Sequence, residues 1–383
     1  MKSDMSKNKL TYIFGHGRLE KIIDNNYEAR DFFYSYFHFK NLNKKIEIIE
    51  MVQEKEIVRG AKLILRFIDK VLRKISNLPF YFCEIVSFKN LRTIFNSEKV
   101  LITNDRLAVS LLPIIIFCKL FSNTEFYVII MGLYSKNKDN RLIKVIQNLI
   151  ITLLENLVSK LIFLGKGELD YAKKVSTNKH KSKFVFLPFS VDFEFWNKGD
   201  LTNEKSNQIL FIGNDGNRDY NFVQELAKEL PQFTFLFISK NINEDALNDN
   251  SKLIRGSWNN YELTDSELRE IYKNSFAVIL PLKESYQPSG QSVSLQAMAS
   301  SVPVIITKTN GFWDYEKFEN QKHIIFCKDN NISEWRNTIN NLNQNNILYE
   351  ELVFNAKKLV SESYNLEVFH KILLDILNIN ENF

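Results

Sequence analysis

Residues 277–306 constrain the fold more than any other part of this sequence. An apolar run (277–280) ends in a loop marked by proline and glycine (281–290), after which a helical pattern leads to a second apolar run (302–306). A strand, a loop, a helix and a second strand in this order form one βαβ unit, in which the two strands lie parallel. The loop then lies at the carboxyl end of a strand, where open α/β sheets bind ligands.

Apolar runs alternate with helical patterns on both sides of a polar segment, residues 197–208, which lacks periodicity as a linker does. This alternation predicts an α/β protein with two doubly wound Rossmann-like domains. Strands are expected at 10–14, 46–50, 100–103, 126–130, 161–164, 184–187, 209–212, 233–238, 252–256, 277–280, 302–306 and 324–327. Helices are expected at 27–40, 56–76, 107–121, 142–160, 220–230, 264–274, after residue 290, and between 333 and 379.

The domain boundaries follow from this pattern. We expect an N-terminal domain at 1–196, a linker at 197–208, a C-terminal domain at 209–360 and a last helical segment at 361–383. A chain of 383 residues, 45% of them apolar, is long enough for two domains that each have a full core.

The net charge of +5 hides an asymmetry between the two halves. Residues 1–190 contain 32 Lys and Arg against 18 Asp and Glu, which gives +14, and residues 191–383 contain 18 against 27, which gives −9. A basic half with an amphipathic pattern at 56–76 suits an anionic membrane surface or an anionic acceptor. A solvated surface and a helix that packs on a core are the plainer alternatives. No nucleic-acid motif accompanies the charge, so we expect no nucleic-acid partner.

Three features bear on location. Cys83, Cys118 and Cys327 lie far apart without metal-ligand spacing, which predicts buried thiols in a reducing compartment. The first nine residues are polar and show no signal peptide. No uncharged apolar run reaches the roughly 18 residues that span a bilayer. We therefore expect a cytoplasmic protein, with peripheral contact at the inner membrane face as a further possibility.

The segment 289–299, SGQSVSLQAMA, resembles the donor-binding segment of family 4 glycosyltransferases, and the strand that begins at Pro303 continues the resemblance. The segment 188–196, just before the linker, is similar to another segment of that family. The resemblance implies the GT-B fold, in which two domains face a central cleft and the C-terminal helix crosses back to the first domain. It also implies a nucleotide-sugar donor, retention of anomeric configuration, and no requirement for a metal or another cofactor.

The helix entrance after residue 288 is suited to a phosphate. Backbone N–H groups at a helix N-terminus are unpaired and carry partial positive charge, and a glycine permits close approach of a ligand. An ordinary helix capped by Ser292 is the alternative. The donor-binding candidates at this entrance are Ser289, Gly290, Gln291 and Ser292.

A second donor-binding candidate is a cation. Arg218 follows Gly213 by five residues, just before a predicted helix. By resemblance, basic residues near this position hold the diphosphate. The family usually has a second basic residue directly after the glycine, where this chain has Asn214. The alternative is that Arg218 only pairs with Asp215 or Asp219.

Two positions depart from the family pattern. Gln296 stands where the family has a Glu that bonds the ribose hydroxyls; an amide both donates and accepts but lacks the charge. A surface glutamine is the alternative reading. Pro288 stands at the place of another family Glu, and Glu284 is the candidate to supply that carboxylate, with Gln291 equally a candidate to touch the donor sugar. Trp258 lies where family members hold the base.

On the acceptor side, the candidates are Gly15, His16 and Gly17, which follow the first predicted strand. His16 could act as a base or orient a hydroxyl. Asp105 follows a strand and is the best carboxylate candidate of the first domain. Lys166 lies between two glycines at a strand end and could reach the phosphates across the cleft. The catalytic candidates are His16, Asp105 and Glu284, and for each a structural role is the alternative.

We therefore expect a glycosyltransferase of hexosyltransferase type. It would move a sugar from a nucleotide diphosphate to a hydroxyl of a surface glycan or a lipid-linked saccharide. A non-catalytic GT-B protein that serves as a partner subunit or a glycan-binding module is the alternative. Pro288 and Asn214 motivate it, because they remove two polar contacts that the family makes.

Overall fold

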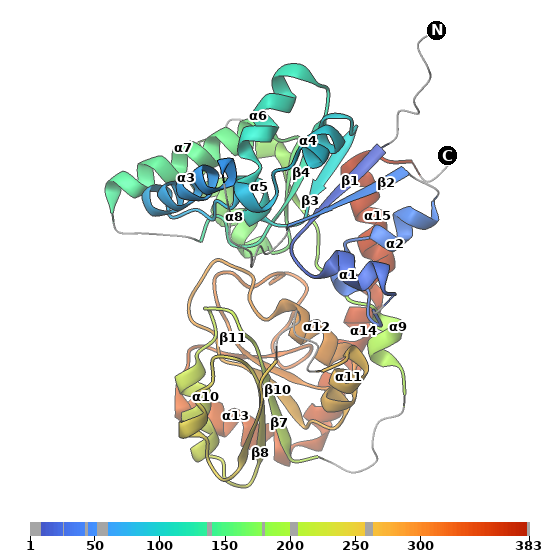
Figure 1. Cartoon of the computed structure of the whole chain (residues 1–383). Coiled ribbons are helices and arrows are strands. Elements are labelled where there is room, and N and C mark those ends of the chain that lie inside the picture. Colours follow the sequence, from blue (N-terminus) through green and yellow to red (C-terminus); the bar gives the residue numbers. More distant parts are fainter. Residues whose placement is uncertain are drawn as a thin grey trace.

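A computed structural model describes residues 9–25, 27–42, 45–51, 60–135, 140–177, 181–199, 206–256 and 263–380. These residues form two six-stranded sheets with the orders β2-β1-β3-β4-β5-β6 and β12-β11-β10-β7-β8-β9. All neighbouring strands pair in parallel. Figure 1 shows one sheet above the other, each with helices around it. The predicted pair of doubly wound α/β domains is confirmed.

The bounds of the elements agree with most of the predicted ranges. The strands are β1 (Lys9–Phe14), β2 (Lys45–Glu50), β3 (Lys99–Ile102), β4 (Glu125–Ile130), β5 (Lys160–Phe163), β6 (Phe184–Phe186), β7 (Gln208–Ile212), β8 (Thr234–Ile238), β9 (Ser251–Ile254), β10 (Ala277–Leu280), β11 (Val304–Thr307) and β12 (Ile325–Cys327). The helices are α1 (Arg18–Ile23), α2 (Tyr36–Asn41), α3 (Ala61–Ser76), α4 (Phe88–Phe95), α5 (Asp105–Ser110), α6 (Leu112–Phe121), α7 (Arg141–Leu157), α8 (Lys166–Val175), α9 (Phe193–Asn197), α10 (Tyr220–Lys228), α11 (Asp265–Lys273), α12 (Gln291–Ala299), α13 (Ile332–Gln344), α14 (Asn346–Ser363) and α15 (Leu366–Leu377).

The helix predicted at 27–40 is wrong as a single element. Tyr34 and Ser35 have positive φ angles of 48° and 64°, a left-handed conformation that a continuing helix does not contain. A short 3-10 helix (Asp31–Phe33) therefore precedes α2. The helix predicted at 107–121 is likewise divided, since Pro113 lies in the first turn of α6 and cannot donate to α5. Helices α1, α4, α8 and α9 were not predicted.

The central strands of each sheet are buried on both faces, as is typical of parallel sheets. In β3, Val100 and Ile102 join the core under α5, α6 and α7, whereas Leu101 points to the opposite face. The core on that opposite face is shared by the two sheets and continues through Trp196 and Tyr272 into α12. The two domains are therefore joined by buried apolar surface.

The C-terminal helix crosses back to the first domain, as predicted. Figure 1 shows α15 beside β1 and α2. Ser35 Oγ lies 2.7 Å from His370 Nδ1, and the rings of Tyr34 and Phe369 are 6.4 Å apart. These contacts place the end of the chain against the N-terminal sheet.

The structure also bears on two further predictions, which concern the cysteines and membrane-spanning segments. The three cysteines, Cys83, Cys118 and Cys327, are buried free thiols. Among the described helices, none is long and apolar enough to cross a membrane.

Candidate donor site

A cavity of about 220 Å³ lies between the two domains. The C-terminal domain contributes the carboxyl ends of β7, β8 and β9 and the first turns of α11 and α12. The N-terminal domain contributes α1 and the segment 29–32. This is the edge at which parallel sheets bind ligands. The polar residues that line it include Lys21, Asp31, Asn214, Asp265, Ser292 and Gln296.

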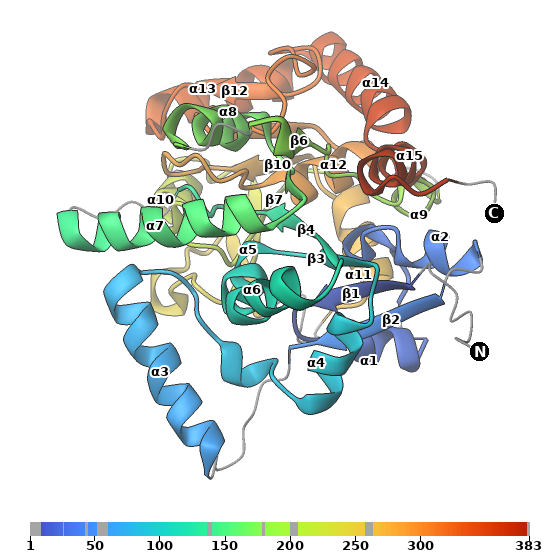
Figure 2. The same cartoon turned by 90° about the horizontal axis from the view of Figure 1, so that it is seen from above.

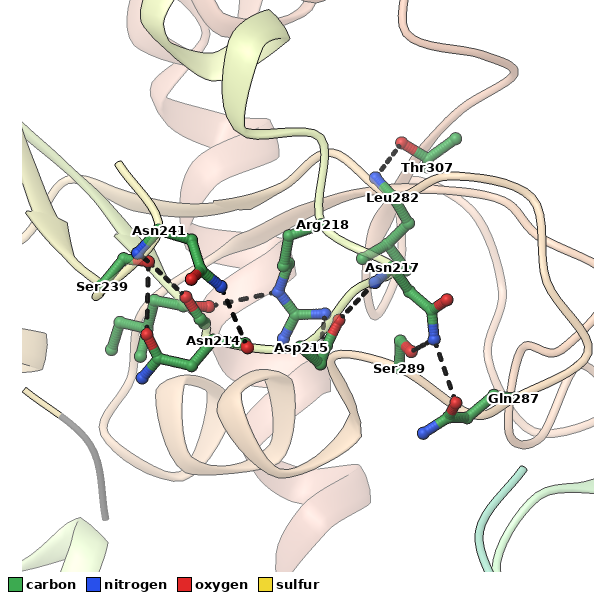
Figure 3. A network of polar contacts seen from close by, with 12 residues as sticks. Asn214, Asp215, Asn217, Arg218, Ser239, Asn241, Leu282, Gln287, Ser289 and Thr307 are labelled. Atoms are coloured by element: carbon green, nitrogen blue, oxygen red, sulfur yellow. Dashed lines mark hydrogen bonds and ion pairs between the residues drawn. The ribbon is translucent and has the colours of Figure 1, made fainter. Parts of the chain in front are cut away.

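Arg218 does not itself line this cavity, but Ile212, whose carbonyl accepts a hydrogen bond from its side chain, does, and Arg218 is only 3% exposed. Its Nε donates to the carbonyl of Ile212 at 3.3 Å, and Nη1 lies 3.1 Å from Asp215 Oδ2. Figure 3 shows the guanidinium beside Asp215. The pairing with Asp215 thus occurs, but Nη1 makes no hydrogen bond of good geometry within the described residues. Burial lowers the pKa of Arg218, against the opposing charge of Asp215, and the group stays a cation.

The entrance of α12 lies close to Arg218. The helix begins at Gln291 with Gly290 as its N-cap at φ +81°, and no side chain caps it. The alternative, in which Ser292 caps the helix, is therefore wrong. A Cβ placed on Gly290 would lie 3.8 Å from Arg218 Nη1. Unpaired backbone N–H groups and a buried cation thus converge at one place, which is an arrangement that suits a diphosphate.

Ser289 and Gln291 are both buried and already hydrogen-bonded. Ser289 Oγ accepts from Asn217 Nδ2 at 2.8 Å, as Figure 3 shows. Gln291 Nε2 donates to the carbonyl of Leu164 in the N-terminal domain at 2.9 Å. Gln291 therefore ties the start of α12 to the residue that follows β5.

Gln296 contacts a carboxylate of the other domain. Its Nε2 donates to Asp31 Oδ2 at 2.7 Å, and its Oε1 accepts from the Tyr272 hydroxyl at 3.2 Å. The glutamine is 5% exposed, so the alternative of a surface glutamine is wrong. Asp31 was not among the residues predicted for the site. The signal that could have found it is a single acid inside the aromatic-rich segment 31–39.

Beyond α12, loops of the two domains are in close contact. A Cβ on Gly165 would lie 2.8 Å from Pro288 Cβ, and a Cβ on Gly167 would lie 2.1 Å from the carbonyl oxygen of Asn310. Pro288, which stands at the place of a family Glu, therefore packs against the N-terminal domain. The domains meet here through backbone and small side chains.

Lys166 belongs to this contact. It is the first residue of α8, and its Nζ lies 2.8 Å from Asp314 Oδ1 and 2.5 Å from Glu316 Oε2. Burial lowers the pKa of Lys166, but the hydrogen bonds to the two carboxylates outweigh burial and raise it overall. Lys166 therefore meets carboxylates of the C-terminal domain, and its contact with the donor phosphates stays a prediction.

No family model and no curated protein sequence matches the chain. Solved structures match over almost its whole length. A glycosyltransferase from Rickettsia africae ESF-5 is 13% identical, with a TM-score of 0.65 over 98% of this chain and 100% of its own. Anabaena HepE, solved with UDP, is 11% identical, with a TM-score of 0.64 over 97% and 99%. Sucrose-phosphate synthase from Thermosynechococcus elongatus is 10% identical, with a TM-score of 0.67 over 97% and 98%.

This chain has the GT-B fold. Its sheets and the crossing of α15 agree with those neighbours, and the cavity beside Arg218 lies in the GT-B cleft between the domains.

The loop that carries the acceptor-side candidates Gly15, His16 and Gly17 lies next to the start of α5. The loop at 15–17 joins β1 to α1, and Gly17 adopts φ +92° as the N-cap of α1. A Cβ on Gly15 would lie 3.6 Å from the side-chain amide nitrogen of Asn104, so this loop neighbours the start of α5. His16 is exposed, whereas Asp105 is 4% exposed.

The third catalytic candidate, Glu284, is exposed and accepts a hydrogen bond from the backbone N–H of Asn310 at 3.0 Å. Within the described ranges, His16, Asp105 and Glu284 are not among the residues that line the cavity of about 220 Å³. Trp258 lies outside the described residues.

This protein has a second cavity, of about 780 Å³, between the segment 30–41 and α15. His38 and His370 line it, with their rings stacked at 4.5 Å. Of the described residues predicted for the site, none lines this second cavity. The described part of the chain also holds no group of three or more His, Cys, Asp or Glu side chains that could hold a metal ion.

Proposed function

We propose that this protein is a glycosyltransferase that moves a sugar from a nucleotide-diphosphate donor to a hydroxyl acceptor. The observation that carries the proposal is the convergence of Arg218 Nη1 and the uncapped start of α12 beside the interdomain cavity. Negative charge builds on the diphosphate as the sugar departs, and fixed N–H groups and a buried cation stabilise that charge. The GT-B neighbours support this donor, since HepE was solved with UDP and with UDP-glucose.

The proposed reaction needs no protein nucleophile. The bond between the anomeric carbon and the diphosphate oxygen breaks, and a new bond to the acceptor oxygen forms on the same face of the sugar. The acceptor proton passes to the leaving phosphate. By resemblance to family 4, we propose that the transfer is retaining, moves a hexose and is independent of metal. His16 and Asp105 remain the candidates to orient the acceptor hydroxyl.

The proposed acceptor is a surface glycan or a lipid-linked saccharide. Exposed apolar side chains on α3 and α7 favour the lipid-linked saccharide. Six apolar side chains of α3 and four of α7 are 40% to 69% exposed. They are Leu63, Ile64, Phe67, Ile68, Val71, Ile75, Leu142, Val145, Leu149 and Leu153. Their spacing puts each set on one side of its helix. The two helices contact each other and lie at the same edge of the molecule (Figure 2). These ten side chains form the α3–α7 face.

The flank of α3 beside this face is basic. Lys62, Lys70 and Lys74 are exposed, whereas Asp69, the acid of this helix, is 1% exposed. Apolar side chains that enter the headgroup region, flanked by lysines that attract anionic lipids, characterise interfacial helices. We propose that the α3–α7 face contacts an anionic membrane surface from the cytoplasm, where a lipid-linked acceptor is at hand.

Calorimetric titration tests the donor site. UDP, GDP, ADP, CMP and their sugars are titrated with and without Mg²⁺. We expect saturable, metal-independent binding of one nucleotide by the wild type. In Arg218→Ala we expect affinity at least about 10-fold weaker, because a hydrogen bond to a charged group contributes about 1.5–3 kcal/mol. Arg336→Ala is the matched control, since this arginine is 42% exposed and pairs with Glu229 on the surface.

Two outcomes would contradict the proposal in different ways. Failure of the folded wild type to bind any nucleotide would remove the donor site. Binding without turnover of any nucleotide sugar, in the presence of acceptor extracts, would favour the non-catalytic partner subunit or glycan-binding module.

A further inference from the structure

A buried carboxylate of the N-terminal domain is presented to the donor cavity. Asp31 is 4% exposed and lines the cavity of about 220 Å³. Its Oδ2 accepts from Trp196 Nε1 at 2.8 Å and from Gln296 Nε2 at 2.7 Å. Its Oδ1 accepts from the backbone N–H of Asp192 at 2.6 Å. A carboxylate has about four acceptor sites, so these three bonds leave capacity on Oδ1.

The segment that carries Asp31 is held against the C-terminal domain. The backbone N–H of Ala29 donates to Asp265 Oδ2 at 3.2 Å. The carboxylate of Glu28 accepts from both the backbone N–H and the hydroxyl of Ser266, each at 2.7 Å. The position of Asp31 in the cavity is therefore set by contacts with α11 as well as by its own hydrogen bonds.

The amide of Gln296 has one orientation in this arrangement. The carboxylate of Asp31 only accepts, so the Nε2 side must face it, and Oε1 then accepts from the Tyr272 hydroxyl. The resemblance to family 4 predicts a carboxylate at residue 296 that binds the ribose. This chain has an amide there, and a carboxylate lies 2.7 Å from that amide on the opposite domain.

We propose that Asp31 supplies the carboxylate that accepts hydrogen bonds from the ribose hydroxyls of the nucleotide, and that Gln296 is a positioning residue that holds it. The inference rests on the proposed function, because it requires a nucleotide in this cavity. A hydroxyl that donates to Asp31 Oδ1 makes a charge-assisted bond, which is stronger than a bond to a neutral amide. The donor site would then be completed by both domains and would exist only when they are in contact.

The test compares ribonucleotides with their deoxy analogues. The wild type, Asp31→Asn, Gln296→Glu and the double variant are titrated calorimetrically with UDP, GDP and ADP and with the 2′-deoxy and 3′-deoxy forms of each. We expect the wild type to prefer one ribonucleotide over a deoxy form by about 10-fold or more, since a bond to a charged group contributes about 1.5–3 kcal/mol. Asp31→Asn should bind the ribonucleotide and its deoxy form equally, with the affinity that the wild type has for the deoxy form.

The double variant separates a ribose contact from a merely structural role. Gln296→Glu puts a second carboxylate where the family has its ribose-binding Glu, so this variant should keep a ribose preference even if the like charge displaces Asp31. Asp31→Asn with Gln296→Glu again has one carboxylate and one amide, and part of the preference should return. Glu28→Gln is the control, since Glu28 holds the same segment but does not line the cavity. It should keep the full ribose preference.

Each outcome supports or overturns the inference. Equal affinity of the wild type for ribo- and deoxynucleotides overturns it and leaves the proposed function standing. A folded Asp31→Asn that keeps the ribose preference, with only a lower melting temperature, also overturns it. If Asp31→Asn does not fold, Asp31→Glu, which keeps the charge but moves the carboxylate, is compared in the same way, and an unchanged ribose preference overturns the inference. Absence of any nucleotide binding by the wild type overturns the proposed function and the inference together.

Discussion

The side chain of Arg218 runs directly over the backbone of Gly213. A Cβ placed on Gly213 would lie 2.4 Å from Arg218 Nε, 3.0 Å from Cγ and 3.1 Å from Cδ. The backbone next to Arg218 is itself fixed, because the N–H of Asp219 donates to the carbonyl of Pro281 at 3.0 Å. A methyl group at residue 213 must therefore displace the guanidinium from its place beside the cavity.

Gly213→Ala should weaken nucleotide binding at least about 10-fold, because the displaced guanidinium loses its charge-assisted contact with the diphosphate. Its free energy of unfolding should fall by about 1–3 kcal/mol, the usual cost of overpacking. Gly216→Ala, in the same loop, is the control, since a Cβ there meets nothing within 4 Å. Calorimetry and denaturant unfolding measure both effects. Equal nucleotide affinity in the two variants would contradict the role given to Gly213.

Phe67→Glu should weaken binding to vesicles that contain anionic lipid several-fold, because it puts a charge in the middle of the α3–α7 face. Phe354→Glu on α14 is the matched control, as Phe354 is 67% exposed and Phe67 is 66% exposed. Co-sedimentation with phosphatidylglycerol vesicles and with phosphatidylcholine vesicles measures the difference. The membrane proposal fails if the two variants sediment alike, or if the wild type binds neither kind of vesicle.

Gly167→Ala should open the contact between the domains. A Cβ there would lie 2.1 Å from the carbonyl oxygen of Asn310 and 2.9 Å from the Cα of Gly311, and neither backbone atom can rotate away. We expect a loss of about 1–3 kcal/mol in the free energy of unfolding and a larger radius of gyration by small-angle scattering. An unchanged radius, compared with Gly216→Ala, would show that this contact does not set the arrangement of the domains.

Asp31 should make the stability depend on pH. Burial raises its pKa from 3.8 to about 7, although hydrogen bonds from Gln296, Asp192 and Trp196 lower it part of the way and the charge of Asp192 raises it. Lys21 and Asp265 also face the cavity. The folded state binds this proton more tightly than the unfolded state does. The contribution of Asp31 to the free energy of unfolding therefore decreases as the pH rises from about 4 to 7, and levels off above that range.

The measurement is a difference between the wild type and Asp31→Asn, because other titrating groups are common to both. Denaturant unfolding from pH 4 to 8 should give a wild-type free energy that declines relative to the variant up to about pH 7. A difference that stays constant over this range would show that Asp31 is already ionised at low pH.

The pattern of apolar and polar residues along the sequence predicted most of the strands and helices, but fewer of the contacts in the candidate site. Continuous apolar runs identified the strands, because buried parallel strands need apolar residues on both faces. The break at Tyr34 and Ser35 left no such signal, since neither residue favours a positive φ by itself. The donor candidates Arg218 and Gly290 were proposed because Arg218 follows Gly213 by five residues just before a predicted helix and Gly290 lies at a predicted helix entrance.

The sequence by itself determined the two doubly wound sheets and the loop at Gly290, because the periods of strands and helices and the conformational freedom of glycine are local properties. Only the tertiary structure decided that Gln296 faces Asp31, which lies 265 positions earlier, and that Lys166 meets Asp314 across the cleft. Which polar side chains of the two domains interact depends on their distance, burial and geometry, and these properties exist only in the folded chain.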